Sequence, residues 1–510
     1  MTDFIGLAAF AGAFVLLAEA AHRKKKLRKA LLFGFVGALA FGLGHHALTT
    51  ASFVGGSAGL LVKLGLAMLA GAAVLEVRES KPKVLLLPGV LALLLGGAIF
   101  VTGALVGGAV SFAKGRLQKT VPGQCLLELG PDDSITEKPI QDVLRKYKVK
   151  AERAFPSVSM EESVDLAQTF LLTGPPDSLE ALMTELRADT ENVDHVEPNF
   201  AVGLTDPEPV ERPDVDRGGL LANDPHLGEQ WGFELTEGDR VHRLLKERKP
   251  RRKAIVAIVD TGVDGRHEDI TSVFGESPGA RDGHGHGTHC AGIAGAATNN
   301  GLGIASYNWE GRFVTVRGYK ALSDNGGGSA ESVSEAIIAA ARDRADVISL
   351  SLGGYAPTPP RAEVLAVEFA IKKGCIVVCA AGNSNEDAKL HAPANIPGVI
   401  VVSALDQGMR KASFSNTNTS LGLPIAAPGV DIFSLKPGTG YVGMSGTSMA
   451  TPMVSGLIGV IRSLHPKITT EEVHKLLVET GTEGQDASRI GTSINAGSAV
   501  EAAASGAAGR

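Results

Sequence analysis

Apolar runs with the length of strands alternate with helical stretches through the second half of this 510-residue chain. The runs are rich in Val, Ile, Ala and Leu, which is typical of strands buried on both faces. Strand–helix alternation predicts βαβ units, and we expect a doubly wound parallel sheet, an α/β domain, over residues 223–510. The expected strands are Ala254–Val259, Phe313–Gly318, Val347–Leu352, Ile376–Ala380 and Val399–Ala404. The clearest expected helices are Ala330–Arg344 and Pro360–Lys372.

Three short motifs close or open these elements. The first strand ends in Asp260-Thr261-Gly262, a histidine follows in Gly285-His286-Gly287-Thr288, and Ser448 opens a helix expected to run to Arg462. Sites in parallel sheets form at the carboxyl ends of the strands. A serine hydroxyl needs a base within hydrogen-bond reach before it acts as a nucleophile. The pattern therefore indicates Ser448 as nucleophile, His286 as general base and Asp260 as the group that orients the imidazole.

The sequence around Ser448 fits this role. Gly446 is expected to allow a tight turn before the serine. Pro452 is expected near the helix start, where it removes no hydrogen bond. The N–H groups at that helix start would favour an anionic intermediate.

The order Asp, His, Ser along the chain is that of subtilisin, and together the motifs resemble the subtilase family of serine proteases over about residues 223–504. The resemblance implies that Asn383, which closes the run Ala380-Ala381-Gly382-Asn383, donates to the oxyanion. It also implies a groove in which an extended peptide substrate pairs with the backbone. One rim of this groove would be Ser351, Leu352 and Gly353, and the opposite rim would include Gly327.

A calcium site is a further implication of the resemblance. Asp269 matches the carboxylate ligand of the family, and residues 298–304 match the loop that wraps Ca²⁺. Oxygen atoms are the ligands that calcium prefers. In the loop they would come from Thr298, Asn300, Leu302 and Ile304. A plain Asn-Gly turn is the alternative interpretation of the same loop.

Single motifs are compatible with two other chemistries. Asp-Thr-Gly also opens the site of aspartic proteases, but only one copy occurs and its flanks are those of a parallel strand. His284, His286 and His289 have the close spacing of a zinc site. No carboxylate or thiolate set accompanies them at ligand spacing, and Cys290 is expected to be a buried thiol.

The first 120 residues predict a bundle of about four transmembrane helices. A helix needs about 20 apolar residues to cross the hydrocarbon core, and four spans approach or exceed that length. They are Phe4–Ala21, Ala30–Thr49, Phe53–Val77 and Val84–Phe112. Lys63 lies inside the third span, where it would snorkel, pair with Glu19 or mark a functional position.

Basic residues indicate the orientation of these spans. The segment His22–Lys29 holds six positive charges and is expected in the cytoplasm. With four spans the rest of the chain then lies outside, as in a multi-pass cell-membrane protein with an extracytoplasmic catalytic domain. Lys114, Arg116 and Lys119, after the last span, argue mildly against this orientation.

Charge and cysteine content exclude other classes of protein. Residues 1–120 carry 13 Lys/Arg and 4 Asp/Glu, so the chain's net charge of −6 leaves −15 for the other 390 residues. An acidic soluble region is no nucleic-acid binder. Four cysteines do not make a disulfide framework, and Cys375 and Cys379 are too far apart on one strand for a bridge.

Residues 121–203 predict a small domain between membrane and enzyme. Its strand–helix–strand–strand–helix–strand order is ferredoxin-like, and it resembles the propeptide inhibitor domain of subtilases. The expected elements are Cys125–Leu129, Ile140–Tyr147, Ala151–Phe155, Leu166–Leu172, Ser178–Arg187 and Val193–Val202. A Pro- and Asp-rich linker, residues 204–222, follows, and Asn223-Asp224-Pro225 looks like the start of a mature enzyme.

These features together predict a membrane-anchored, extracytoplasmic serine endopeptidase. It would hydrolyse protein or peptide substrates through an acyl-enzyme and, as a zymogen, remove its own inhibitory prodomain. A catalytically inactive peptide-binding fold is one alternative, which intact Asp260, His286 and Ser448, together with Asn383, disfavour. The other alternative is a membrane sensor or transporter with an attached processing protease; polar clusters inside the spans would support it, and only Lys63 does so.

Overall fold

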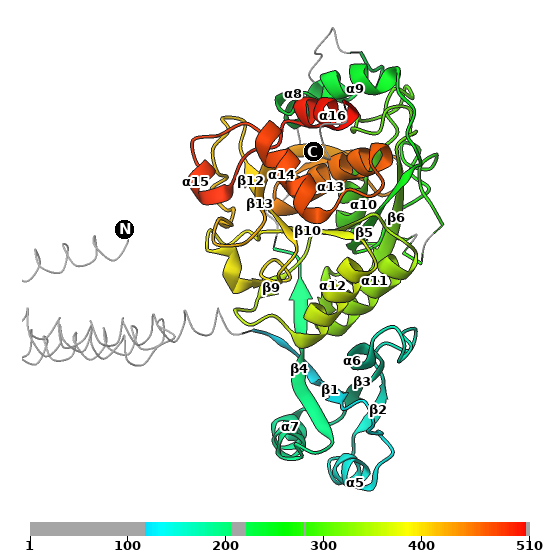
Figure 1. The fold of residues 1–510 in the computed structure, drawn as a ribbon, viewed down its shortest axis with the longest axis vertical. Helices are drawn as coiled ribbons and strands as arrows, with labels where there is room; N and C mark the ends of the chain where they lie inside the picture. Colours follow the sequence, from blue (N-terminus) through cyan, green and yellow to red (C-terminus); the bar gives the residue numbers. More distant parts are fainter. Residues whose placement is uncertain (1–117, 206–220, 277, 280, 506–510) are drawn as a thin grey trace, which may run out of the picture. The chain divides into compact units, whose positions relative to one another are not determined.

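The computed structural model describes residues 118–205, 221–276, 278–279 and 281–505, and its largest sheet has six parallel strands (Figure 1). The sheet order is β13-β12-β10-β8-β5-β6. From β5 the chain adds β6 on one side and the remaining strands on the other, which confirms the doubly wound prediction. The strands are β5 Ala254–Asp260, β6 Val314–Lys320, β8 Val347–Leu350, β10 Ile376–Ala380, β12 Ile400–Leu405 and β13 Pro424–Pro428.

Both faces of this sheet are covered by helices. Successive residues of a strand point to opposite faces, so Val256 and Ile258 of β5 enter one apolar core while Ala257 and Val259 enter the other. The first core includes α10 (His286–Gly295) and α13 (Thr447–Leu464). The second includes α11 (Ala330–Arg342) and α12 (Arg361–Lys372), which lie side by side in Figure 1. Burial on both faces explains the absence of polar alternation in the strands.

Helix α13 packs closely against its neighbours, and all 18 of its residues are buried. A Cβ atom on Gly456 would lie 2.3 Å from the carbonyl oxygen of Ala294 on α10. A Cβ atom on Gly459 would lie 2.7 Å from the Val256 side chain on β5. Glycine at these two positions therefore lets the helix approach both α10 and the sheet.

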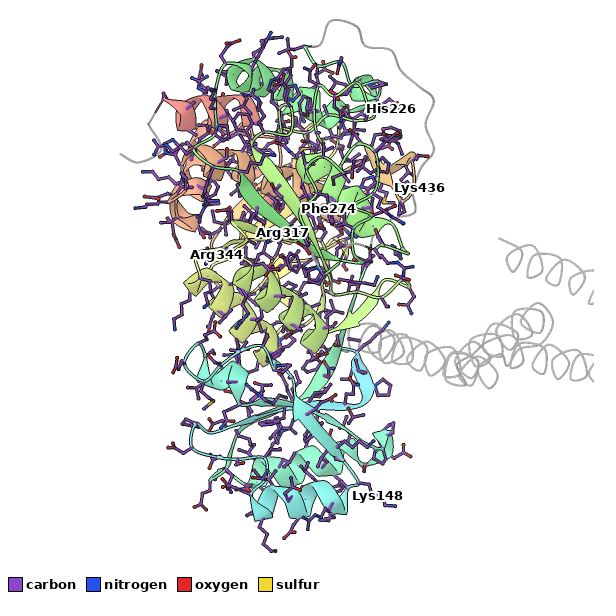
Figure 2. The ribbon with its side chains drawn as sticks, turned by 90° about the vertical axis from the view of Figure 1, so that its right-hand side faces the viewer. Lys148, His226, Phe274, Arg317, Arg344 and Lys436 are labelled. Atoms are coloured by element: carbon purple, nitrogen blue, oxygen red, sulfur yellow. The ribbon has the colours of Figure 1, made fainter. Side chains whose placement is uncertain are left out.

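A smaller antiparallel sheet has the order β2-β3-β1-β4-β7, in which four strands precede this domain and β7 (Gly327–Ser329) belongs to it. Leu127, Leu172 and Leu182 are among the buried side chains between this sheet and its own helices, while Leu126 and Phe155 belong to the core of α11 and α12. The positive-φ residue Lys148 lies in the turn between α5 and β2 (Figure 2). The elements are β1 Thr120–Leu129, α5 Lys138–Lys146, β2 Lys150–Arg153, α6 Val164–Ala167, β3 Thr169–Thr173, α7 Leu179–Ala188 and β4 Val193–Gly203.

The remaining elements are short or peripheral. The strands are β7 Gly327–Ser329, β9 Gly354–Tyr355, β11 His391–Ala392, β14 Ile432–Lys436 and β15 Gly440–Met444. The α-helices are α8 Trp231–Leu235, α9 Gly238–Lys246, α14 Thr470–Thr480, α15 Ala487–Ile490 and α16 Ala496–Ala504. The 3₁₀ turns are Pro176–Ser178, Leu227–Glu229 and Ala388–Leu390.

The four predicted membrane spans lie within residues 1–117, outside the described residues. Over residues 118–205, 221–276, 278–279 and 281–505, no helix has the length and apolar character needed to cross a bilayer. All four cysteines of the chain are free and buried, which agrees with the expectation that they form no disulfide framework.

Candidate active site

The predicted acid and base meet at the carboxyl end of β5. Asp260 is the last residue of β5, His286 is the first residue of α10, and both side chains are buried. Nδ1 of His286 lies 2.8 Å from Oδ1 and 2.9 Å from Oδ2 of Asp260. An ionised carboxylate only accepts hydrogen bonds, so Nδ1 carries the hydrogen and Nε2 is the basic nitrogen. A general base for serine needs this tautomer.

The predicted nucleophile, Ser448, is the second residue of α13, and its Oγ donates to the Ser351 carbonyl at 3.2 Å. Pro452 has no N–H to give to the Ser448 carbonyl one turn earlier. That carbonyl instead accepts from Ser351 Oγ at 2.8 Å and Cys290 Sγ at 3.4 Å. The expectation that Pro452 removes no helical hydrogen bond is therefore wrong. Gly446 is extended (φ 158°, ψ 160°), and the chain bends there directly before α13, where the turn was expected.

Asn383 lies beyond the end of β10 and is oriented by Thr447. Its Oδ1 accepts from the N–H and from Oγ1 of Thr447, each at 2.9 Å. A backbone N–H can only donate, so the atom that faces it must be the amide oxygen. Nδ2 is then the donor end of the Asn383 amide, as an oxyanion ligand requires.

The predicted groove holds a strand of this same chain. Gly203, the last residue of β4, forms an antiparallel bridge with Gly353, with both N···O distances 3.4 Å. On its other side the segment Ala201–Gly203 pairs with Gly327–Ser329. Gly353 and Gly327 therefore stand on opposite sides of this strand, and Leu352, next to Gly353, is buried in the core of α11 and α12. Figure 1 shows β4 running from the small sheet into the larger domain.

The predicted calcium loop surrounds a buried carboxylate. Asp269 Oδ2 accepts from the Ile304 N–H at 2.8 Å, and Oδ1 accepts from Asn300 Nδ2 at 2.9 Å. Burial raises the pKa of Asp269 to about 7. Among the described residues, no hydrogen bond reaches the carbonyl oxygens of Leu302 or Ile304, whereas that of Thr298 accepts from a backbone N–H. A buried carboxylate beside open carbonyl oxygens fits a hard cation.

Asp224 is a second carboxylate at this loop, which the sequence reasoning did not select. Its oxygens accept from the N–H groups of Asn299 at 2.8 Å and Asn300 at 3.3 Å. Burial raises its pKa to about 6. The sequence does show an acidic residue in Asn223-Asp224-Pro225, but this motif predicted only the start of the mature enzyme and no contact with the loop of residues 298–304.

The three histidines His284, His286 and His289 do not bring their ring nitrogens within mutual reach in the part of the chain that the structure describes. His289 Nε2 lies 3.0 Å from the Val442 carbonyl, and the rings of His284 and His286 are 6.3 Å apart. Within the described residues, the one set of three potential metal ligands in mutual reach is Asp260, His286 and Cys290, which is the acid–base pair itself. Burial raises the pKa of the Cys290 thiol, so it is not a ready thiolate ligand.

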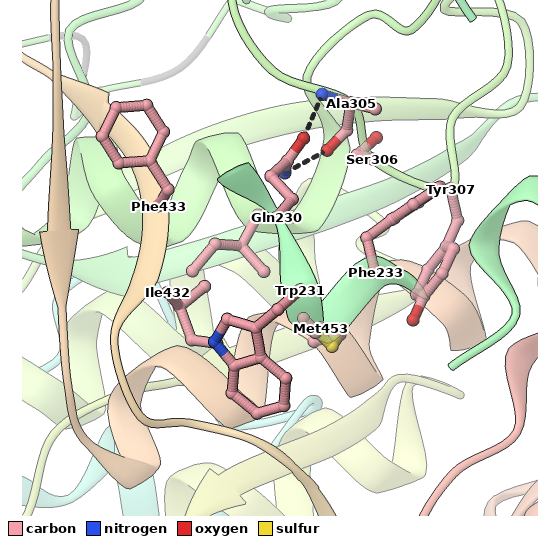
Figure 3. Close-up of a pocket in the computed structure, with 11 residues that line it drawn as sticks. Gln230, Trp231, Phe233, Ala305, Ser306, Tyr307, Ile432, Phe433 and Met453 are labelled. Carbon is pink, nitrogen blue, oxygen red and sulfur yellow. Dashed lines mark hydrogen bonds between the residues drawn. The ribbon is translucent and has the colours of Figure 1, made fainter. Parts of the chain in front are cut away.

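Gln230, in the segment before β5, holds Ala305, the residue that follows the loop of residues 298–304. Gln230 pairs with both the N–H and the carbonyl of Ala305, at 2.7 and 2.8 Å (Figure 3). Trp231 Nε1 donates to the Val430 carbonyl at 3.0 Å. The cavity between these side chains has a volume of about 20 Å³, enough for a water molecule but not for a peptide.

Comparison with known proteins decides the family. Residues 251–493 match the Subtilase family. Thermitase from Thermoactinomyces vulgaris is 42% identical over 249 residues, which cover 47% of this chain and 85% of thermitase. Subtilisin DY from Bacillus licheniformis is 36% identical over 275 residues, which cover 52% of this chain and 95% of the relative. The chain belongs to the subtilase family.

A longer relative is matched only in part. The thermophilic serine proteinase of Bacillus sp. (strain AK1) is 43% identical over 245 residues, 47% of this chain and 58% of the relative. The family match begins at residue 251, after the small domain. As a subtilase, the chain is a subtilisin-like serine endopeptidase by class, and the predicted α/β catalytic domain is confirmed.

Proposed function

We propose that this subtilase cleaves peptide bonds through Ser448, with His286 as general base, Asp260 as its orienting acid and Asn383 as oxyanion donor. The proposal rests on the His286 Nδ1 hydrogen, held by both Asp260 oxygens beside a groove that holds an extended strand. His286 would accept the Ser448 proton as the acyl-enzyme forms and would return it to the leaving amine. Asn383 Nδ2 would donate to the oxygen that becomes negative in the tetrahedral intermediate.

Fluorophosphonate labelling of the full-length protein tests this assignment. Ser448→Ala should abolish both labelling and peptide hydrolysis, because the attacking oxygen is gone. Ser445→Ala, three residues earlier, is the matched control and should keep both. Labelling that persists in Ser448→Ala would place the nucleophile elsewhere.

We propose further that residues 121–203 act as an inhibitory prodomain and that the enzyme cuts the chain itself within residues 204–222. Support comes from the register in the groove: Gly203 pairs with Gly353, so two residues further along an antiparallel pair Thr205 faces Ser351. The Ser351 carbonyl accepts from Ser448 Oγ at 3.2 Å. This register favours cleavage directly after Thr205. A permanent linker that keeps the protease at the membrane is the competing possibility.

Expression of the full chain with a tag at each end separates these possibilities. Wild type should yield a fragment whose first residue is Asp206, determined by N-terminal sequencing. Ser448→Ala should remain one polypeptide. A wild-type protein that hydrolyses peptides yet stays intact would contradict the proposed cut.

The proposal for the first 120 residues is a multi-pass membrane anchor with the catalytic domain on the outer side. The basic segment His22–Lys29 supports this orientation. Carbonate-washed membranes should retain the uncut Ser448→Ala chain. A membrane-impermeant amine reagent applied to intact cells should label its catalytic domain, and labelling only after lysis would reverse the orientation.

For the loop beside Asp269 we propose a structural Ca²⁺. Its ligands would be the side chains of Asp269 and Asn300, backbone oxygens of Thr298, Leu302 and Ile304, and the Asp224 carboxylate. The two buried carboxylates support this, because a bound cation would compensate their charge.

A further inference from the structure

Asp282 lies in the loop between β5 and α10, outside the catalytic motifs, and accepts five hydrogen bonds. Its Oδ1 accepts from Thr261 Oγ1 at 2.9 Å and from the N–H groups of His284 at 3.0 Å and Gly285 at 2.8 Å. Its Oδ2 accepts from the N–H of Thr288 at 2.9 Å and from its Oγ1 at 2.7 Å. A carboxylate offers about four lone-pair positions, so this acceptor is fully used.

The donors come from both elements that carry the acid and the base. Thr261 follows Asp260 directly, and its N–H donates to Asp260 Oδ1 at 2.6 Å. Thr288 is two residues after His286, in the first turn of α10. One carboxylate therefore ties the strand end to the helix start, on either side of the Asp260–His286 hydrogen bond.

Asp282 also supplies the cap that α10 lacks. The residue at the cap position is Gly285, which has no side chain to offer the first N–H groups of the helix. The Gly287 N–H donates instead to Thr261 Oγ1 at 3.0 Å, and the Thr288 N–H donates to Asp282. A negative charge is favourable at this end of a helix.

We infer that Asp282 is a positioning residue for the catalytic base: it holds the first turn of α10 to Thr261 and thereby fixes His286 against Asp260. The inference rests on the proposed roles of His286 and Ser448. Asp282 has no part in proton transfer itself, so its loss leaves the triad present but less well aligned. A misplacement of about 1 Å can lower a rate on the order of 10²-fold.

The test compares Asp282→Asn and Asp282→Ala in the full-length protein. Asparagine keeps the shape but turns one oxygen into an NH₂ group that faces N–H donors. We expect kcat per fluorophosphonate-titrated Ser448 to fall roughly 10- to 100-fold with KM changed less than about twofold. Titration counts competent sites, so a variant that only folds or matures poorly would show fewer sites with normal kcat. Formate should raise the kcat of Asp282→Ala, because Asp282 is partly exposed and a small carboxylate can reach its place.

Two reference variants make the outcomes distinguishable. Asp324→Asn removes a neighbouring carboxylate, which accepts from the Gly283 N–H at 3.3 Å, and should keep kcat within about twofold. His286→Ala should be inactive, and activity in that variant would overturn the proposed triad together with this inference. If His286→Ala is inactive but Asp282→Asn has wild-type kcat per site, the positioning role alone is overturned. Failure of formate to restore any activity to Asp282→Ala would also count against it.

Discussion

The amide of Asn383 can face only one way, because Thr447 gives it two donors on the oxygen side. We therefore expect Asn383→Ala to lose the donor to the oxyanion and to lower kcat about 10²- to 10³-fold, or about 3–4 kcal/mol, with little change in KM. This magnitude is the one known for subtilisin, a member of the same family, and is carried over from it. Steady-state kinetics on a peptide ester and a peptide amide provide the measurement. A fall in kcat of less than threefold would remove Asn383 from the oxyanion site.

At this scale the sequence predicted side chains that sit at the ends of regular elements. The contact between Asp260 and His286 could be predicted because Asp260 ends a strand and His286 begins a helix. The roles of three other residues could not be predicted: Asp282, Asp224 and Thr447. Their hydrogen-bond partners depend on the conformation of loops, which residue spacing does not reveal. Asp282 reaches 21 residues back to Thr261, and Asp224 reaches 75 residues ahead to Asn299.

At the scale of elements, the loop of residues 298–304 offers the clearest stability test. Chelation should lower the melting temperature, because a ligand bound only by the folded state stabilises it, by about 2.7 kcal/mol at 100 times Kd. Asp269→Asn should remove most of this calcium-dependent increment, and Asp324→Asn should retain it. Differential scanning fluorimetry with calcium and with EDTA is the measurement. Equal melting temperatures for a calcium-loaded wild type before and after EDTA would contradict the site.

The positions of strands and helices could be predicted from the spacing of apolar residues wherever burial determines that spacing. The strand predicted over Ile376–Ala380 was found with the same bounds, and the helix predicted over Ala330–Arg344 ends two residues earlier. Strand β7, Gly327–Ser329, could not be predicted as a strand. Its residues have no strand propensity, and it is extended because β4 pairs with it.

At the scale of the whole molecule, one of the contacts between the small domain and the larger domain brings two carboxylates together, those of Glu197 and Glu363. Glu197 on β4 accepts from the N–H groups of Arg361 at 3.0 Å and Ala362 at 3.2 Å, at the start of α12. Glu363, in the same first turn, is buried, and its Oε2 has no hydrogen-bond partner within the described ranges. Burial and then the charge of Glu197 raise the pKa of Glu363 to about 8.

This arrangement predicts that binding of the proposed prodomain to the catalytic domain depends on pH. With Glu197 present, Glu363 keeps its proton up to about pH 8, and without Glu197 it releases the proton at lower pH. Binding is thus linked to proton uptake, so affinity should fall as pH rises toward about 8 and then level off, at most about tenfold per pH unit. The rate of prodomain release from the cut complex, followed by gel filtration between pH 5.5 and 9, measures this.

Two substitutions on α12 provide the comparison. Glu363→Gln should flatten the pH dependence, because the amide does not titrate. Glu368→Gln, on the exposed side of the same helix, should leave it unchanged. A wild-type release rate that is constant across this range would contradict the linkage.

The complete burial of α13 determines how the enzyme loses its activity over time. A helix with no exposed residue exchanges its amide hydrogens only when the surrounding packing opens as a unit. The nucleophile near its start is therefore not lost by fraying, and activity on heating should be lost no faster than the folded domain unfolds. Each molecule that unfolds becomes a substrate for the enzyme molecules that are still folded. The fraction of activity lost per hour should consequently be larger in concentrated stocks than in dilute ones, and the molecules that remain intact should keep full activity.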